Sequence, residues 1–568
     1  MLTKEKTEPV NPTEKFIPEL SNGVWLSLVI LFSLLLRFFR LDQPDLWLDE
    51  TYQFYYSRLP ASDIMAHNNP DQLPLSFYLN NFFLSFTTHI DAGSLRLPSA
   101  WLGLGIVLAC YGLGQELFDK KVGLMAAFLA SFWPMLLLYS QEYRMYALFG
   151  LLSTCSALYL LKALRTGSPW YWAVFSLATV LNLYNHFNAL IVLASSLTFG
   201  VLYLVLAHPR RREALSSKEA LSGKSAKSWY YPSISLGVML VAYLPGIFFL
   251  LKFLDTSNGG LEKAYFAPDL TFSLFNDMLD KMGLGGGLVA LLIFVLALLG
   301  FIWAFGQFPR AAAFAFVWLG LPFLGIAALE KAHAVLLSWR YLIFLVPVYI
   351  VLVAAGTVAM LPGLARLIAG LRFLPPALGS YLTRKPGQVA ALLLFLISSP
   401  AVIGYYVNPK AYDRYSIDTD LGGAFEYLKA NLEPTDVILA YSSNNIAAGD
   451  VSWFQFYFPY YLRDVPASVT RLIPIPQNQA EHYVPALSSS GKLWTIINYN
   501  GNSGELEEIG GAFAETRCFR KICVIRSPDA TGLNMANKLE NFLTSYRQIN
   551  PELSRFTLDA LKRARSIS

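Results

Sequence analysis

The stretch Leu46-Trp47-Leu48-Asp49-Glu50-Thr51 follows closely after the first long apolar segment, residues 24–39. Two adjacent carboxylates just beyond a membrane span make a candidate reaction centre at a bilayer surface, because a carboxylate there can act as a general base. The same pair also fits a solvated loop or a helix N-cap. A reaction centre at this point needs a substrate that arrives through lipid and a cation for the leaving group, so the rest of the chain must supply spans and basic residues.

The composition is that of a membrane protein. Hydrophobic residues make up 55% and charged residues only 15% of the 568-residue chain, and the mean hydropathy is +0.42. Soluble domains carry about 25% charged residues. The net charge of +5 does not indicate a nucleic-acid partner, because the Lys and Arg residues cluster in short loops between apolar segments. We therefore expect a polytopic membrane protein whose first apolar segment is a retained span.

Apolar segments long enough to cross the hydrocarbon core recur along the first 406 residues and predict about 11 transmembrane helices. The predicted spans are residues 24–39, 99–117, 122–139, 145–161, 170–184, 187–207, 231–251, 287–305, 311–329, 341–360 and 389–406. The short junctions near Tyr139 and Tyr184 are the weakest boundaries of this assignment. The predicted fold class is thus a multi-span α-helical bundle.

The charges of the loops predict the orientation of the bundle. Lys and Arg mark alternate loops, and the positive-inside rule places these loops in the cytoplasm. They include Lys120, Lys121, Lys162, Arg165, Arg210, Arg211, Arg212, Lys218, Lys224, Lys227, Arg310, Arg366, Arg372, Arg384 and Lys385. An odd number of spans then sends the C-terminus out of the cytoplasm. We expect a multi-pass protein of a bacterial inner membrane, with a long outer loop at residues 41–95.

After residue 406 the composition becomes that of a soluble domain, so we predict a transmembrane domain over residues 1–406 and an extracytoplasmic α/β domain over residues 407–568. The expected elements are helices at 420–431, 534–546 and 552–565 and strands at 436–440, 492–497 and 517–526. Of four cysteines, Cys518 and Cys523 can pair if their segment is an outer hairpin. The cysteines and histidines form no zinc pattern.

Two outer loops are more than plain linkers. Residues 74–86 are apolar but too short to span, which predicts a segment lying in the membrane interface. The connection 252–286 is long and ends near Gly283-Leu-Gly-Gly-Gly287, and long loops of this kind can close over a substrate.

Several ionisable residues and one glutamine are predicted to lie on the outer side, and polar residues of this kind at membrane depth are usually functional unless they snorkel. They are Asp49, Glu50, Arg96, Gln141, Glu142, Arg144, His186, Lys331, His333 and Arg340. Each has a simpler interpretation. Arg96 and Arg144 fit interfacial anchors, and His186 fits a hydrogen-bonded structural residue. Arg37 and Arg40 are expected to snorkel to the interface.

Three motifs in order carry a family resemblance: Leu46-Trp-Leu-Asp-Glu-Thr-Tyr52, Leu95-Arg-Leu-Pro-Ser-Ala-Trp-Leu-Gly103 and Tyr139-Ser-Gln-Glu-Tyr-Arg-Met-Tyr-Ala147. They resemble successive motifs of the GT-C glycosyltransferases of family 39, which include protein O-mannosyltransferases and the lipid A aminoarabinose transferase. The stretches Tyr184-Asn-His-Phe187 and Trp339-Arg-Tyr-Leu-Ile-Phe-Leu-Val-Pro347 are similar to later family segments. One departure is Asp71-Gln-Leu-Pro-Leu-Ser-Phe-Tyr78, where relatives have a His-Pro-Pro-Leu-Tyr-like motif.

The resemblance implies inverting transfer of a hexose or pentose from a polyprenyl-phosphate donor to an acceptor hydroxyl at the outer face. Asp49 would be the base, and Glu50 would orient the acceptor or an arginine. The resemblance assigns the donor phosphate to Arg96 and Arg144, and position alone adds Lys331 and Arg340. Further site candidates are Asp71, Glu142, Tyr146 and His186. No metal and no cofactor are required beyond the lipid-linked sugar, and the acceptor is a protein, a lipid or a cell-envelope glycan.

Two other classes of membrane protein are alternatives. A lipid or sugar transporter or flippase would line a passage with its charges, but such proteins show paired halves or broken midplane helices, and no repeat is evident here. A polymer ligase or polymerase would share the lipid-linked donor, and only the order of the motifs argues against it.

Overall fold

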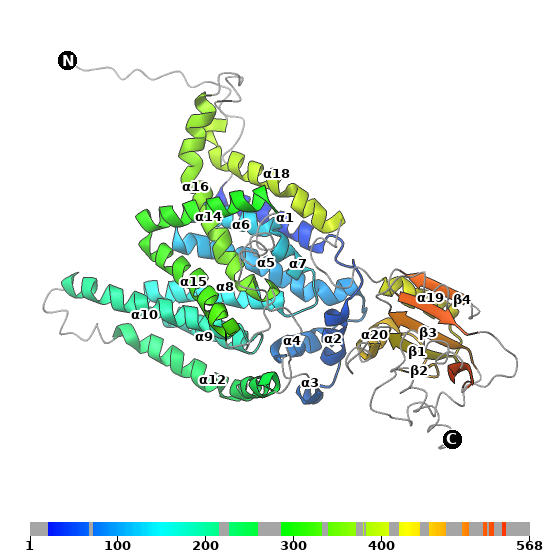
Figure 1. Cartoon of the computed structure of the whole chain (residues 1–568). Coiled ribbons are helices and arrows are strands. Elements are labelled where there is room, and N and C mark those ends of the chain that lie inside the picture. Colours follow the sequence, from blue (N-terminus) through cyan, green and yellow to red (C-terminus); the bar gives the residue numbers. More distant parts are fainter. Residues whose placement is uncertain are drawn as a thin grey trace, which may run out of the picture. The chain divides into compact units, whose positions relative to one another are not determined.

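The computed structural model is mainly helical, with one small sheet near the C-terminal end (Figure 1). The structure describes residues 21–67, 72–214, 227–258, 286–331, 339–370, 379, 382–407, 420–442, 454–472, 491–498, 515–519, 522–527, 535 and 537–540. Its contacts divide the chain into two compact units. The helical unit contains residues 1–39, 99–141 and 145–402. The second unit contains residues 40–98, 142–144 and 403–568, and we call it the outer unit after the predicted position of its loop 41–95.

Every predicted span coincides with helical structure. The helices are α1 (Asn22–Phe38), α5 (Ala92–Leu117), α6 (Lys120–Phe132), α7 (Pro134–Ser140), α8 (Tyr146–Thr166), α9 (Pro169–Leu183), α10 (Ala189–Ala214), α12 (Lys227–Asn258), α14 (Leu288–Gln307), α15 (Pro309–Lys331), α16 (Val346–Gly370) and α18 (Pro386–Val407), with a 3-10 turn η2 (Trp339–Leu345) before α16. Within the described residues, six helices are long and apolar enough to cross a membrane, or seven with the bent pair α6 and α7. Helix α1 and the described part of α10 and α15 are shorter apolar helices.

The third predicted span, residues 122–139, is broken. Helices α6 and α7 meet at an angle of 60° because Pro134, the first residue of α7, has no N–H to donate to the carbonyl of Ala130. Arg37 of α1 takes this place and donates to the carbonyls of Ala130 at 3.2 Å and Ser131 at 2.8 Å. Arg37 is therefore fully buried, and the prediction that it snorkels is wrong.

Glycines allow the closest helix packing in the helical unit. On α14 and α16, Gly300 faces the carbonyl of Leu352 and Gly356 faces the carbonyl of Leu296, and a Cβ at either glycine would collide with that carbonyl. Close backbone contact through small residues is a common way for membrane helices to associate. It holds α16, which is almost wholly buried over residues 346–356, within the bundle.

The outer unit contains a five-stranded mixed sheet with the order β2-β1-β3-β5-β4. Its strands are β1 (Val437–Ser442), β2 (Thr470–Leu472), β3 (Leu493–Asn498), β4 (Glu515–Phe519) and β5 (Ile522–Arg526). The segment 517–526 is therefore a hairpin and not the single predicted strand. A disulfide joins Cys518 to Cys523, which are cross-strand neighbours in the antiparallel pair β4 and β5.

The first outer loop folds into three short helices, α2 (Leu48–Ser57), α3 (Ala61–His67) and α4 (Leu75–Leu84), in the same compact unit as the sheet. Helix α4 covers most of the segment predicted to lie in the membrane interface. Two more helices of the outer unit are α19 (Leu421–Asn431), which matches the helix predicted at 420–431 and is capped by Asp420, and α20 (Phe454–Tyr461). The expected boundary at residue 406 stays a prediction, since these contact units divide the chain differently.

Some predicted features fall outside the described residues. These are most of the loop 252–286, the helix at 552–565, and most of the helix at 534–546.

Candidate active site

Asp49 and Glu50 lie in the first turn of α2, where carboxylates interact favourably with the positive end of the helix dipole. Trp47, the N-cap residue, has an extended backbone, and its N–H donates to the Glu50 carboxylate at 3.4 Å. This is the reach-back half of a capping box. The pair thus lies in the first turn of a helix and not in a solvated loop, but the N-cap is Trp47 and neither carboxylate takes the N-cap position considered from the sequence. The remaining contacts of the two carboxylates differ sharply.

Glu50 forms a buried two-pronged ion pair with Arg96. The Nε and Nη2 atoms of Arg96 each donate to a different Glu50 oxygen at 2.7 Å, and each side chain is only 1% exposed. The backbone N–H of Tyr143 donates to Glu50 at 2.8 Å. One carboxylate therefore ties together the start of α2, the start of α5 and the segment 142–144. We call Glu50, Arg96 and Tyr143 the buried clamp.

The other donors of Arg96 bind the loop before α2. Its Nη1 donates to the carbonyls of Leu41 at 3.1 Å and Pro44 at 2.8 Å, and its Nη2 also reaches the carbonyl of Asp45 at 3.4 Å. With the two bonds to Glu50, all five N–H groups of this guanidinium are engaged. Arg96 has none left for an incoming phosphate in this arrangement.

Asp49 has a looser environment next to Arg144. Its side chain is 27% exposed, and Oδ2 lies 3.9 Å from Nη2 of Arg144. The Arg144 Nη1 donates to the Asp49 backbone carbonyl at 3.2 Å, and Nη2 donates to Gln72 at 3.4 Å. We call Asp49 and Arg144 the loose pair. Its carboxylate is accessible, and its cation is held beside it by long hydrogen bonds.

Of the neighbouring candidates Glu142 and Asp71, the structure describes only Glu142. Glu142 is buried two residues before Arg144 in the same unit. Gln72, which the sequence reasoning did not single out, contacts Arg144 from the loop between α3 and α4. Its neighbour Asp71 lies outside the described residues. The motif Asp71–Tyr78 was noted only as a departure from the family pattern, and this was the one signal that could have found Gln72.

An aromatic helix of the C-terminal region packs on α2. The hydroxyl of Tyr461 donates to the carbonyl of Leu46 at 2.8 Å, and burial raises the pKa of this hydroxyl well above its ordinary value, so it remains a donor. Phe456 contacts Tyr52 edge-on, with ring centroids 4.9 Å apart, and Tyr460 contacts Phe54 at 5.6 Å. The loop that carries the carboxylates thus rests on α20.

The sequence reasoning missed this support. The available signal was the segment Phe454-Gln-Phe-Tyr-Phe-Pro-Tyr-Tyr461, which is unusually aromatic for a soluble domain. Such a run buries a large apolar area, and its most economical partner is another aromatic surface, here Leu48–Ser57 with its three tyrosines.

Three other candidates gather in the helical unit. His186 stacks on Phe149 with ring centroids 4.5 Å apart and lies 5.0 Å from the Tyr341 ring and 6.2 Å from the Tyr146 ring. Arg340 lies over the rings of Tyr146 and Tyr341, 5.8 and 5.7 Å from their centroids. His186 Nδ1 accepts from the backbone N–H of Asn188 at 3.1 Å, which leaves the proton of a neutral ring on Nε2.

The remaining candidate, Lys331, ends α15, and its side chain is outside the described part. Among the residues that the structure describes, no group of three or more His, Cys, Asp or Glu side chains is placed to hold a metal ion.

Two features define the class of protein with which the chain is compared. The first is a multi-span helical bundle joined to an α/β domain, and the second is a carboxylate beside an arginine at the start of a loop helix. Residues 69–224 match the family model described as dolichyl-phosphate-mannose-protein mannosyltransferase. No curated protein sequence matches the chain. The fold is similar to ArnT from Cupriavidus metallidurans in the apo state, with a TM-score of 0.54 and 12% identity over 89% of this chain and 98% of that one.

The same relative bound to undecaprenyl phosphate aligns with a TM-score of 0.53 and 11% identity, over 90% of this chain and 99% of that one. The family match and the shared fold confirm the predicted resemblance: the chain has the fold of the GT-C membrane glycosyltransferases. The comparisons give no support to the transporter alternative.

Proposed function

We propose that the protein transfers a sugar from a polyprenyl-phosphate donor to an acceptor hydroxyl, by inversion, with Asp49 as the base. The family match and the undecaprenyl phosphate bound to the ArnT relative support the donor class. One observation carries the choice of base. Of the two adjacent carboxylates, Glu50 accepts four hydrogen bonds from buried N–H groups, while Asp49 is partly exposed beside a cation.

The chemical step balances without a cofactor. The acceptor oxygen attacks the anomeric carbon as its proton passes to Asp49, and a new C–O bond forms. The bond from that carbon to the phosphate oxygen breaks, and its electron pair leaves with the polyprenyl phosphate. General-base assistance of this kind contributes about 10²- to 10⁴-fold in rate.

Arg144 is the cation best placed to stabilise the developing phosphate charge, because it adjoins Asp49 and its hydrogen bonds are long enough to be exchanged for stronger ones. For Arg96 we propose a different role from the phosphate binding that the resemblance implies, whereas Glu50 keeps one of its two expected roles, the orientation of an arginine. Both are positioning residues that hold the loop before α2 in place, because every Arg96 donor is already engaged. Arg340, with its two tyrosines, remains a candidate for donor binding in the helical unit.

The proposed place of the reaction is the non-cytoplasmic face of a bacterial inner membrane. This rests on the Lys and Arg content of alternate loops. It is also supported by the disulfide between Cys518 and Cys523 in the outer unit, because disulfides persist outside the cytoplasm.

The test is Asp49→Asn in purified protein, assayed for release of polyprenyl phosphate from a polyprenyl-phosphate sugar. Transfer should fall at least ~10²-fold, while detergent-solubilised yield and thermal unfolding stay near those of the wild type. Asp42→Asn is the matched control, since Asp42 is an exposed aspartate of the same loop. Near-normal turnover by Asp49→Asn, or an equal loss in the control, would overturn the assignment of the base.

A further inference from the structure

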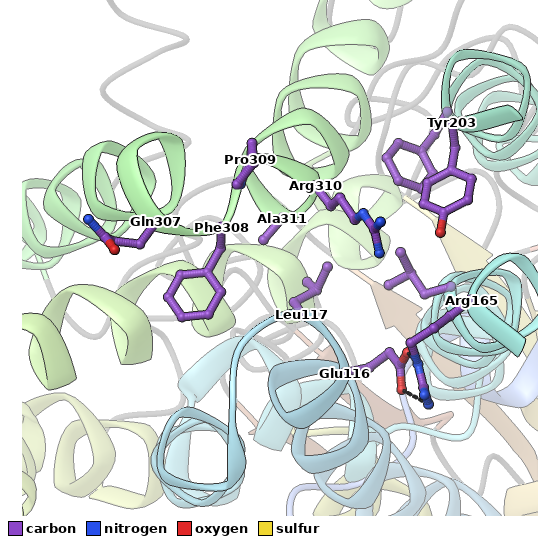
Figure 2. A pocket seen from close by; sticks show the side chains of 11 residues that line it. Glu116, Leu117, Arg165, Tyr203, Gln307, Phe308, Pro309, Arg310 and Ala311 are labelled. Carbon is purple, nitrogen blue, oxygen red and sulfur yellow. Dashed lines mark hydrogen bonds and ion pairs between the residues drawn. The ribbon is translucent and has the colours of Figure 1, made fainter. Parts of the chain in front are cut away.

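A pocket of about 300 Å³ lies within the helical unit, apart from every residue assigned to the chemistry. Five helices line it: the C-terminal ends of α5 and α8, the middle of α10, the end of α14 and the start of α15 (Figure 2). Apart from the middle of α10, these are helix ends that the alternation of the predicted spans places together on the cytoplasmic side. The volume is about ten times the ~30 Å³ that one water molecule occupies in the liquid, which suits a small headgroup.

The lining divides into an apolar floor and a charged rim. Leu117, Leu161 and Phe199 are buried. At the rim, Arg310 is exposed and lies over the Tyr203 ring, 5.4 Å from its centroid. An apolar floor beneath a cation matches a ligand that carries both a hydrocarbon part and a charged head.

The sign of the charge follows from the second arginine. Arg165 donates to both oxygens of Glu116, one of them at 3.1 Å, and Figure 2 shows this pair across the pocket from Arg310. Glu116 is thereby neutralised, and its side chain is only 10% exposed, whereas that of Arg165 is 57% exposed. Two arginines against one carboxylate leave the rim positive. A cationic ligand or a metal ion would meet net repulsion there.

We infer that this pocket binds the phosphate of an anionic membrane lipid. Arg310, backed by the positive end of α15, receives the phosphate, and the first carbons of the lipid lie on Leu117, Leu161 and Phe199. Basic pockets between membrane helices on the cytoplasmic side are suited to acidic lipid headgroups. Free phosphate shares the charge but would leave the apolar floor unused.

Native mass spectrometry of the full-length protein tests the inference. The protein is released from nanodiscs made of equal parts of phosphatidylglycerol and phosphatidylcholine, and retained lipids are counted. Arg310→Ala should lower retention of phosphatidylglycerol roughly fivefold and leave phosphatidylcholine unchanged. Arg366→Ala is the matched control, because Arg366 is an exposed arginine at the end of another helix that is also predicted to be cytoplasmic. Equal losses in the two variants would overturn the site.

A second variant is expected to raise the retention of phosphatidylglycerol, an effect that misfolding would not mimic. Glu116→Gln removes the charge that occupies Arg165, and retention of phosphatidylglycerol should rise. A fall, or no change, would contradict the charge argument. Adding inorganic phosphate separates the two sources of the ligand chemistry. Millimolar phosphate should leave the lipid adducts in place, and full displacement would show a site for free phosphate and overturn the lipid assignment.

Discussion

Asp49 and Glu50 are neighbours in one helical turn, yet the buried clamp and the loose pair are opposite kinds of ion pair. In the clamp, Glu50 meets Arg96 at 2.7 Å with both side chains 1% exposed. In the loose pair, Asp49 lies 3.9 Å from Arg144 and is 27% exposed. A buried, fully bonded pair resists change, whereas a wider and partly exposed pair can exchange its contacts for substrate. The comparison supports the proposal that Glu50 positions the loop and that Asp49 acts as the base.

The largest expected effect on stability comes from breaking the clamp. Glu50→Ala leaves the Arg96 charge buried without its carboxylate, which should cost about 3–5 kcal/mol. Thermal unfolding of the purified protein, or its yield if little accumulates, measures this loss. The corresponding change in the loose pair, Asp49→Ala, should cost about 1 kcal/mol or less. Equal destabilisation by the two variants would show that the two pairs do not differ as the structure indicates.

The next effect is on activity and comes from the cation of the loose pair. Arg144→Ala should reduce transfer about 10²- to 10³-fold, the range measured when one donor to a developing anion is removed. Because lysine keeps the charge but loses the fork of donors, Arg144→Lys should retain part of the activity. Both rates are measured with saturating acceptor, together with the affinity for the donor lipid.

An unchanged rate in Arg144→Ala would exclude a role for this cation in the leaving step. A rate reduced equally by alanine and lysine, with a lowered unfolding temperature in both, would indicate that Arg144 supports the fold instead.

The sequence was sufficient for the features that depend on composition. Each apolar segment predicted as a span is helical where the structure describes it, because a span must be apolar whatever it packs against. For Asp49 and Glu50 the sequence suggested an N-cap as one simple interpretation, whereas both lie inside the first turn after the N-cap residue Trp47. The prediction of a single strand at 517–526 was wrong, because this segment belongs to two strands. Its composition suits one strand or two equally well, and the connecting Arg520 and Lys521 give no hairpin signal.

The roles of the arginines could not be read in this way. Arg96 pairs with a residue 46 positions away, and Arg37 with carbonyls more than 90 positions away. Hydropathy and loop charge predict on which side of the membrane an arginine lies, but not which residue it binds. Arg37 is buried because it bonds two carbonyls at the helix break before Pro134, and hydropathy does not pair a residue of one span with a break in another.

The smallest expected effect concerns how α20 supports both pairs. Tyr461→Phe removes one hydrogen bond, from the tyrosine hydroxyl to the Leu46 carbonyl, and keeps the ring that stacks on Phe425. Stability should fall by about 1 kcal/mol, and transfer should fall modestly because the loop carrying Asp49 loses an anchor. Tyr427→Phe is a matched control, since its hydroxyl bonds Glu515 at the exposed edge of the sheet, away from α2. If α20 positions the loop, Tyr461→Phe lowers the transfer rate at full substrate saturation while Tyr427→Phe does not. Equal transfer rates in the two variants would mean that α20 stabilises the outer unit without influencing the carboxylates.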